Sequence, residues 1–239
     1  MPSSLVAIAR HLRDAAGELR FAPPVTHVYN PLDHAWEPHH RYLQRFGGGR
    51  KQVLLLGMNP GPWGMSQTGV PFGEVAAVRD WLGLTGAVRP PADQHPRRPI
   101  EGFACRRSEV SGRRFWGWAR ERCGSPEAFF RRFFVWNYCP LAFLEASGRN
   151  RTPDHLAADE RRALQEICDE ALRGVVEALA PEWVLGIGRF AEKRAGVALA
   201  GLPVRRATIL HPSPASPLAN RGWAEQVEAQ LAALGIAAP

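Results

Sequence analysis

The sequence has few lysines, no closely spaced cysteines and no long apolar run, and each absence narrows the class of protein. Lys51 and Lys193 are the only lysines among 239 residues, so arginine carries almost all of the positive charge. No apolar run approaches the roughly 20 residues of a membrane span, and the N-terminus lacks the apolar core of a secretory signal. We therefore expect no contact with a membrane and an intracellular location, in the cytoplasm or nucleoid of a bacterium or the nucleus of a eukaryote.

The four cysteines lie far apart in the sequence, without a CxxC pair. This spacing suggests neither a zinc ribbon nor a disulfide framework, and it favours buried free thiols. Four cysteines can ligate an iron–sulfur cluster, but the short spacings typical of such clusters are absent. We expect no metal or other cofactor and keep the cluster as an alternative. The cysteines are Cys105, Cys123, Cys139 and Cys168.

Composition and charge allow one large basic domain. With 45% hydrophobic residues the chain can bury a substantial core, and we expect a single domain over residues 1–239 whose residues 1–24 form a helical extension. The net charge of +7 and the pI near 9.9 favour a polyanionic partner such as nucleic acid. Arginines on solvated faces explain the charge almost as well, because the arginine pairs are dispersed along the chain.

Apolar runs typical of strands alternate with amphipathic segments typical of helices. Such alternation predicts an α/β fold in which helices cover both faces of a four-stranded, mostly parallel sheet. The stretch 83–109 is rich in Pro, Gly and Arg and is expected to be irregular. Strands are predicted at 52–56, 133–136, 183–187 and 204–210. Helices are predicted at 3–19, 33–46, 74–82, 111–122, 126–131, 154–180, 190–200 and 217–234.

Two polar loops follow predicted strands directly. The loop at 57–73 reads GMNPGPWGMSQTGVPFG, and the loop at 211–223 reads HPSPASPLANRGW. Ligands of open α/β sheets bind at the carboxyl ends of the strands, so both loops are candidates for one site at a single sheet edge.

These two loops, together with NYCPL at 137–141, resemble the single-strand-selective monofunctional uracil-DNA glycosylases. The similarity extends over roughly residues 25–236 and includes YNPLDHAWEPH, HPRRPI, SEVSGRRFWGW and SGRNRTP. The resemblance implies the three-layer fold of the uracil-DNA glycosylase superfamily, with a four-stranded parallel sheet. It also implies hydrolysis of the N-glycosidic bond of uracil and C5-oxidised uracils in single- and double-stranded DNA.

The resemblance implies a role for each of four residues. Phe72 corresponds to the aromatic ring that stacks on the flipped base, and Asn137 to the amide that reads the uracil edge. His211 corresponds to the histidine that hydrogen-bonds uracil O2 as negative charge develops there, and Asn59 to the residue that positions the hydrolytic water. Outside this context, Phe72 is more typical of a core residue and Asn137 of a turn cap.

The same resemblance implies the tolerance of the pocket for C5 substituents. Met58 and Gly61 border the C5 position in the family, and the glycine leaves room for a water or a polar substituent, so we expect 5-hydroxymethyluracil to be accepted. Neither Lys51 nor Lys193 lies in a motif, which agrees with hydrolysis without strand cleavage. Glu74, in the same loop region, is interpreted as a helix N-terminal charge.

The loop after the last strand is expected to contact DNA. It departs from the vertebrate members of the family, which carry arginine at the place of Ala215 in a wedge that fills the gap left by the flipped base. Because alanine is short and uncharged, we expect weaker product retention. The DNA-contacting residues are expected to be Ser213, Pro214, Ala215, Ser216, Asn220 and Arg221.

Three other functions stay open at this point. An iron–sulfur uracil-DNA glycosylase would share the fold but needs four cysteines close together in space. A catalytically silent damage-binding module would have lost Asn59 or His211, and both are present. A nucleoside hydrolase would require carboxylates around a metal. The glycosylase interpretation predicts DNA as the partner of a chain that acts as a monomer.

Overall fold

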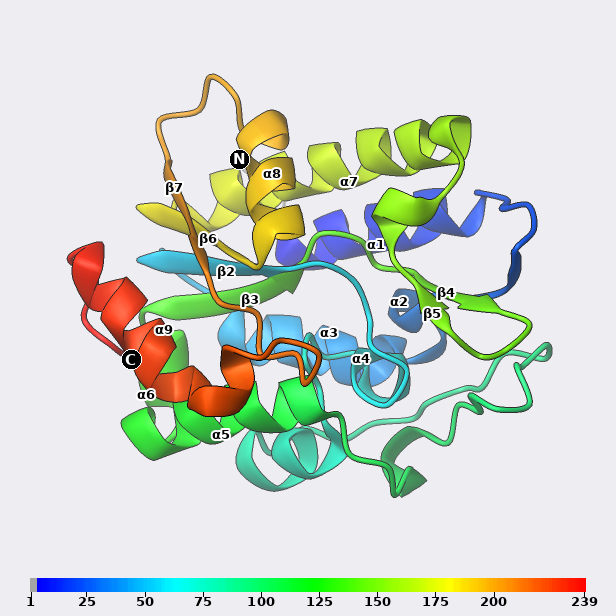
Figure 1. Cartoon of the computed structure of the whole chain (residues 1–239), viewed down its shortest axis with the longest axis horizontal. Helices are drawn as coiled ribbons and strands as arrows, with labels where there is room; N and C mark the ends of the chain where they lie inside the picture. The colour runs from blue at the N-terminus through cyan, green and yellow to red at the C-terminus, as the bar shows by residue number, and fades with distance from the viewer. Residues whose placement is uncertain (1–3) are drawn as a thin grey trace.

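The computed structural model describes residues 4–239, and its centre is a sheet of four parallel strands (Figure 1). The order across the sheet is β3–β2–β6–β7, so β2 and β6 are the inner strands. The predicted α/β fold with a four-stranded parallel sheet is confirmed. The strands are β2 (Val53–Gly57), β3 (Phe133–Asn137), β6 (Trp183–Ile187) and β7 (Arg205–Ile209).

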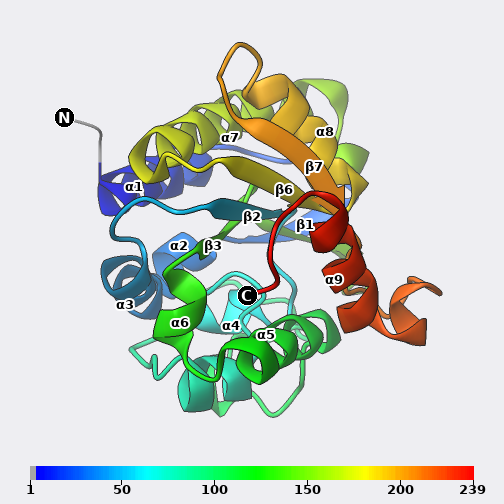
Figure 2. The same cartoon turned by 90° about the vertical axis from the view of Figure 1, so that its left-hand side faces the viewer.

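Helices cover both faces of the sheet and produce three layers, as Figure 2 shows. One layer contains α1 (Leu5–Gly17), α7 (Ala158–Leu179) and α8 (Arg189–Ala198). The opposite layer contains α3 (Trp36–Phe46), α5 (Val110–Cys123), α6 (Pro126–Phe130) and α9 (Trp223–Ala233). Shorter helical segments are α2 (Pro31–His34), α4 (Met65–Thr68), η1 (Ala77–Trp81), η2 (Gly102–Ala104), η3 (Pro153–His155) and η4 (Ala219–Arg221). Among the helices of residues 4–239, none combines the length and apolarity needed to cross a membrane.

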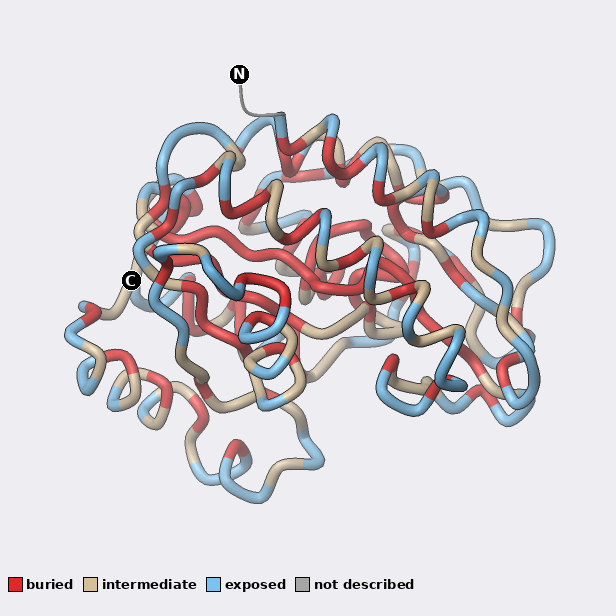
Figure 3. The backbone as a smooth tube through the Cα atoms, turned by 90° about the horizontal axis from the view of Figure 1, so that it is seen from above, coloured by how far each residue is buried: buried red, intermediate tan, exposed pale blue. Residues whose placement is uncertain are grey.

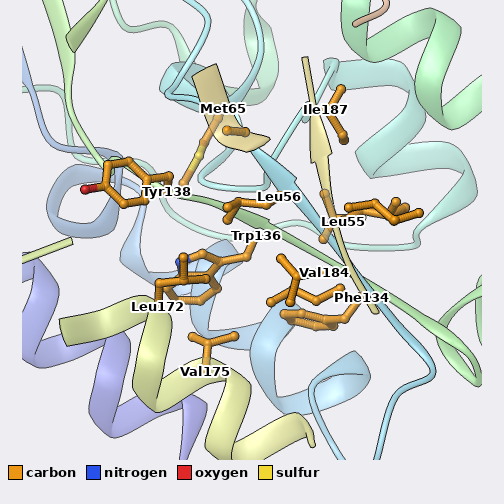
Figure 4. Close-up of a cluster of buried hydrophobic side chains, with 14 of the residues drawn as sticks. Leu55, Leu56, Met65, Phe134, Trp136, Tyr138, Leu172, Val175, Val184 and Ile187 are labelled. Carbon is orange, nitrogen blue, oxygen red and sulfur yellow. The ribbon is translucent and has the colours of Figure 1, made fainter. Parts of the chain in front are cut away.

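The core lies on both sides of the inner strands, and Figure 3 shows buried backbone through the centre of the molecule. Every residue of β2 and β3 is buried, which explains why both strands are continuous apolar runs in the sequence. Figure 4 shows part of this core, to which α7 contributes Leu172 and Val175 and the strands contribute Phe134 and Val184. The edge strand β7 is different, because Arg205 and Arg206 at its start are exposed.

A small antiparallel sheet was not predicted from the sequence. It consists of β1 (Val25–Tyr29), β4 (Ala142–Glu145) and β5 (Asn150–Arg151) in the order β1–β4–β5. These strands are short, and β5 is only two residues long, so none of them produces a clear alternating pattern.

Some predicted helices also begin or end elsewhere. The segment 33–46 is broken at Ala35 into α2 and α3, and the segment 217–234 is broken at Gly222, whose φ of 105° interrupts the helix before α9. The predicted helix 154–180 begins only at Ala158, because Pro153 first starts a 3-10 turn. The helix predicted at 74–82 contains a π-helical turn, η1.

The parallel arrangement brings the two polar loops together. The carboxyl ends of β2, β3 and β7 lie at one edge of the sheet, where the cyan loop after β2 and the orange loop after β7 approach the start of α5 (Figure 1). A hydrogen bond from the Arg114 guanidinium of α5 to the Pro212 carbonyl oxygen, 3.2 Å long, joins the orange loop to that helix.

Candidate active site

A cavity of about 160 Å³ opens between the carboxyl ends of β2 and β3 and the loop after β7. All six residues predicted to bind the base or catalyse the reaction line this cavity. The six are Met58, Asn59, Gly61, Phe72, Asn137 and His211, and the other lining residues are Pro62, Met65, Glu109, Ser111, Asn150 and Thr152. Larger hollows occur elsewhere on the surface, but none of them is lined by these six residues.

Asn59 is fixed by the chain that follows β3. The Asn59 Nδ2 atom donates a hydrogen bond to the Leu141 carbonyl oxygen at 3.1 Å. The backbone of the two loops is also joined, because the carbonyl oxygens of Gly57 and Met58 accept hydrogen bonds from the backbone N–H groups of Tyr138 and Cys139, each 2.9 Å long. This arrangement leaves the Asn59 Oδ1 atom available as an acceptor for a water molecule.

Phe72 lies in an unusual backbone conformation between two other aromatic rings. Its φ of 54° is in the left-handed region, which a bulky residue adopts only when its surroundings hold it there. One side of the ring stacks on Phe115 with 5.0 Å between ring centres, and the His211 ring lies 6.0 Å away. Gly112 makes room for this turn, because a Cβ atom at that position would overlap the Phe72 carbonyl oxygen.

Asn137 is the last residue of β3, and its side chain is buried at the base of the cavity. The Asn137 Nδ2 atom lies 3.1 Å from the sulfur of Met65, and the Oδ1 atom lies against the Cα atom of Gly57. A thioether is a weak acceptor, so the Asn137 amide keeps most of its hydrogen-bonding capacity. Any side chain at position 57 would collide with this amide and with the Phe72 ring.

His211 projects from the loop after β7 in a defined tautomer. Its Nδ1 atom accepts a hydrogen bond from the Ser213 backbone N–H at 3.1 Å, so the neutral ring carries its proton on Nε2. Burial lowers the pKa of His211 to about 4, which keeps the imidazole neutral at physiological pH. His211 can therefore act as a neutral hydrogen-bond donor beside the cavity.

Glu109 also lines the cavity and was not predicted as a functional residue. It lies in the segment SEVSGRRFWGW, which contributes to the family resemblance but was assigned no role at the site. Its Oε2 atom accepts a hydrogen bond from the Trp63 backbone N–H at 3.3 Å. Burial raises the pKa of the Glu109 carboxyl group, and the Trp63 N–H partly offsets this effect. The space beside Gly61 is not open, because the Glu109 carboxyl group lies directly against that glycine.

Asn150 and Thr152 complete one wall of the cavity and were also missed. The Asn150 Nδ2 atom donates to the Pro60 carbonyl oxygen at 3.4 Å, while its Oδ1 atom is buried without a partner in residues 4–239. Both residues belong to the segment that contains the unpredicted strand β5. The segment SGRNRTP, to which both residues belong, was used only as part of the family resemblance, and nothing in it assigned either residue to the cavity.

The groups that other mechanisms would need lie outside the cavity. The buried Lys51 donates from Nζ to the Phe130 carbonyl oxygen at 2.6 Å, and Lys193 is exposed on α8. Glu74 is buried, and its Oε2 atom accepts a hydrogen bond from the Ala77 backbone N–H at 2.9 Å, which agrees with the predicted helix N-terminal charge. Within residues 4–239, no three His, Cys, Asp or Glu side chains gather as metal ligands. These residues therefore do not fit an iron–sulfur cluster or a carboxylate-bound metal.

The residues predicted to contact DNA lie outside the cavity, on and after the loop that follows His211. Pro214 and Ala215 are exposed at its tip, and the Ala215 backbone N–H donates to the Ser213 Oγ atom at 3.1 Å. Asn220 holds the loop, because its Nδ2 atom donates to the Pro214 carbonyl oxygen at 2.9 Å and its Oδ1 atom accepts from Arg114 at 2.8 Å. Arg221 is exposed on η4.

Comparison with known proteins adds two kinds of similarity. Residues 45–232 match the family model described as the uracil DNA glycosylase superfamily. The chain is 55% identical over 221 residues to the single-strand selective monofunctional uracil-DNA glycosylase of Rattus norvegicus. The aligned region covers 92% of this chain and 80% of the rat protein. It is 54% identical over 227 residues to the Bos taurus protein of the same name, and the aligned region covers 94% of this chain and 84% of the bovine protein.

A solved structure also has a similar fold. The crystal structure of SMUG2 from Pedobacter heparinus superposes with a TM-score of 0.67, covering 95% of this chain and 97% of that one. The sequence identity is 17%, so this similarity concerns the fold alone.

Proposed function

The chain belongs to the single-strand selective monofunctional uracil-DNA glycosylases of the uracil-DNA glycosylase superfamily, and we propose that it removes uracil from DNA by hydrolysing the N-glycosidic bond. The proposed substrates include C5-oxidised uracils such as 5-hydroxymethyluracil, in both single- and double-stranded DNA. The products are the free base and an abasic site in an uncut strand. The observation that carries the proposal is the meeting of a neutral His211 donor, the Asn59 amide and the Phe72 ring at one small cavity.

Recognition begins with extrusion of the base, because a stacked base in a duplex cannot reach a cavity of this kind. Extrusion costs a few kcal/mol, and less for a mispaired or single-stranded base. Phe72 stacks one face of the base, and the firm support of its ring by Phe115 favours this role. The Asn137 amide donates to uracil O4 and accepts from N3–H, a combination that cytosine does not offer.

Bond cleavage places negative charge on the leaving base and oxocarbenium character on the sugar. The Nε2–H of His211 donates to uracil O2 as this charge grows. A neutral donor suits the task, because the tautomer is already fixed by the Ser213 backbone N–H and no proton has to be transferred.

Water reaches the sugar with the help of Asn59. The hydrogen bond of the Asn59 Nδ2 atom to Leu141 turns the Oδ1 atom toward the remaining space, where it orients one hydrogen of the attacking water. An amide cannot accept a proton as a carboxylate does, so Asn59 positions the water rather than acting as a strong base. Positioning of the water is sufficient for hydrolysis when the glycosidic bond breaks before the water attacks, because the sugar is then already strongly electrophilic.

Other residues border the C5 edge of the base or contact the DNA. Met58 and Gly61 border the C5 position of the base. Ser213, Pro214, Ala215 and Ser216 approach the duplex at the site of the extruded base, and Asn220 and Arg221 follow them along the DNA backbone. The chain acts as a monomer, without a metal or other cofactor.

An excision assay tests this proposal directly. A fluorescent oligonucleotide containing one uracil is incubated with the wild-type protein and with the Asn59→Ala and His211→Ala variants, and abasic sites are then cleaved with alkali. Wild type should release uracil, and each variant should be about 10²- to 10³-fold slower, the usual loss when a group that stabilises a transition state is removed. Intact substrate with wild type would overturn the proposal, and covalent trapping by borohydride would contradict hydrolysis without strand cleavage.

A further inference from the structure

Glu109 stands at the N-cap position directly before α5, but its side chain does not cap that helix. An acidic residue at a helix N-terminus commonly accepts a hydrogen bond from a backbone N–H of its own first turn, and Glu109 makes no such bond. The carboxyl group turns instead toward the loop after β2, where its Oε2 atom accepts the Trp63 backbone N–H. The side chain is therefore directed to the cavity rather than to its own helix.

The Glu109 carboxyl group occupies the place where a side chain of Gly61 would lie. A Cβ atom added to Gly61 would be 2.5 Å from the Oε2 atom and 2.9 Å from the Oε1 atom of Glu109. Gly64 is similarly close, since its Cβ atom would lie 2.9 Å from the Cγ atom of Glu109. The two glycines thus admit a carboxyl group to the cavity wall, with Oε2 held by Trp63 and Oε1 without a hydrogen bond to the described residues.

The neighbouring positive charges hold Trp63 in place. The guanidinium groups of Arg98 and Arg107 lie 5.0 and 4.7 Å from the centre of the Trp63 ring, within the range of cation–π contacts. Neither guanidinium forms an ion pair with Glu109 in residues 4–239. Glu109 is therefore kept in position by a backbone N–H and two glycines, and its Oε1 atom has no hydrogen-bond partner among the described residues.

The edge of the base that meets Glu109 follows from the proposed function, on which this inference rests. Phe72 covers one face of the base, Asn137 binds the O4 and N3 edge, and His211 binds O2. The C5–C6 edge then faces the wall that contains Gly61 and Glu109.

We propose that Glu109 is a specificity-determining residue whose free carboxyl oxygen reads the substituent at C5 of the base. The hydroxyl of 5-hydroxymethyluracil donates a hydrogen bond to this oxygen, and the carboxyl group supplies the polar partner beside Gly61. The methyl group of thymine makes no such bond and displaces water from the carboxyl group, so Glu109 disfavours the binding of thymine. Uracil has only a hydrogen at C5, so its excision depends little on Glu109.

The new hydrogen bond is distant from the bond that breaks. It is formed equally in the bound substrate and in the transition state, so it lowers KM for 5-hydroxymethyluracil and leaves kcat almost unchanged. A merely structural role of Glu109 would instead reduce excision of every base alike.

The test compares three bases in the same oligonucleotide: uracil, 5-hydroxymethyluracil and thymine. For Glu109→Ala, kcat/KM for 5-hydroxymethyluracil should fall about tenfold relative to uracil, mainly through KM, the size expected for the loss of one well-placed hydrogen bond. Excision of thymine relative to uracil should rise. Glu109→Gln keeps the shape and a weaker acceptor, so its preference for 5-hydroxymethyluracil should lie between those of wild type and Glu109→Ala.

Glu74→Gln is the matched control, because Glu74 is a second buried carboxyl group near Phe72 that does not line the cavity. It should leave the ratio between the bases unchanged. If both Glu109 variants keep the wild-type ratio, or if Glu109→Gln loses excision of all bases equally, Glu109 does not read the C5 substituent. A wild-type protein that leaves uracil intact would refute the proposed function itself, which separates the two failures.

Discussion

The cavity wall and the loop from Ser213 to Arg221 belong to one site but are built in opposite ways. In the wall, Asn59 and Asn137 are fixed by the ends of buried strands and by the chain that follows β3. In the loop, Pro214 and Ala215 are exposed at the tip of a turn that Arg114 and Asn220 hold from outside.

We propose that this difference separates the chemistry from the contact with DNA. Groups that must meet a reacting base within tenths of an ångström lie on the least movable backbone, where each neighbour restricts substitution. Groups that contact a flexible polymer lie on an exposed turn, where a side chain can change without disturbing the core. Ala215, where the resemblance predicts a departure from vertebrate members of the family, lies in the second region, whereas all six predicted cavity residues line the cavity.

The largest expected effect concerns His211, which connects the two regions. Burial lowers the pKa values of His211 and of His39 to about 4. The Nδ1 atom of His39 lies 2.7 Å from the Gly69 carbonyl oxygen. Unfolded histidine titrates near 6.5, so between pH 6.5 and 4 the unfolded chain binds more protons than the folded one. The free energy of unfolding therefore falls as the pH falls, by up to about 3 kcal/mol for each histidine.

Urea unfolding from pH 7.5 to 4.5 measures this dependence, and His39→Gln should make it less steep. NMR titration should show the His211 ring neutral through pH 5.5, and excision of uracil should have no step near pH 6.5. A His211 ring that titrates near 6.5 would place it with the exposed loop rather than with the cavity wall.

A medium effect is expected from one added methyl group in the wall. Gly112→Ala would drive a Cβ atom into the Phe72 carbonyl oxygen and close to Glu74. We expect a loss of about 2 kcal/mol in the free energy of unfolding, which is typical of overpacking, together with slower excision because the Phe72 ring moves. Thermal unfolding and single-turnover excision measure the two consequences.

Gly117 on the same helix provides the control for Gly112. No atom lies within 4 Å of a Cβ added there, so Gly117→Ala should stabilise the protein by about 0.5–1 kcal/mol, the helix preference of alanine, and leave excision unchanged. Equal behaviour of the two variants would show that the wall is not tightly packed around Phe72.

The family resemblance assigned the six cavity residues, and the topology of the sheet explains why three of them meet. Asn137 ends β3, and Asn59 and His211 come shortly after β2 and β7. A parallel sheet brings such ends together by its topology. The strands β2 and β3 were found because burial on both faces makes them continuous apolar runs, whereas β7 starts with two exposed arginines. The fold class followed from their alternation with helices.

The residues that sequence reasoning missed reach the cavity by other routes. Glu109 comes from a stretch expected to be irregular and from the position just before α5, where a capping role is the ordinary expectation. Asn150 and Thr152 depend on the small antiparallel sheet, whose strands are too short to show a period. Local patterns do not encode such long-range contacts, which only the assembled fold reveals.

The smallest expected effect lies in the exposed loop and returns to Ala215. Because this side chain contacts solvent at the tip of the turn, Ala215→Arg should fold like wild type and excise uracil from single strands at the same rate. On duplex DNA the added side chain can fill the gap left by the base and contact a phosphate. Release of abasic duplex should then become about three- to tenfold slower, and its salt dependence should steepen by about one counterion.

Ala215→Gln separates the two contributions of arginine, because glutamine adds length without charge. If filling the gap dominates, the glutamine variant should slow release almost as much as arginine while keeping the wild-type salt dependence. If the phosphate contact dominates, only arginine should slow release. Equal, tight binding of abasic duplex by wild type and Ala215→Arg would contradict both, because retention of the product would then come from the cavity wall and not from the loop.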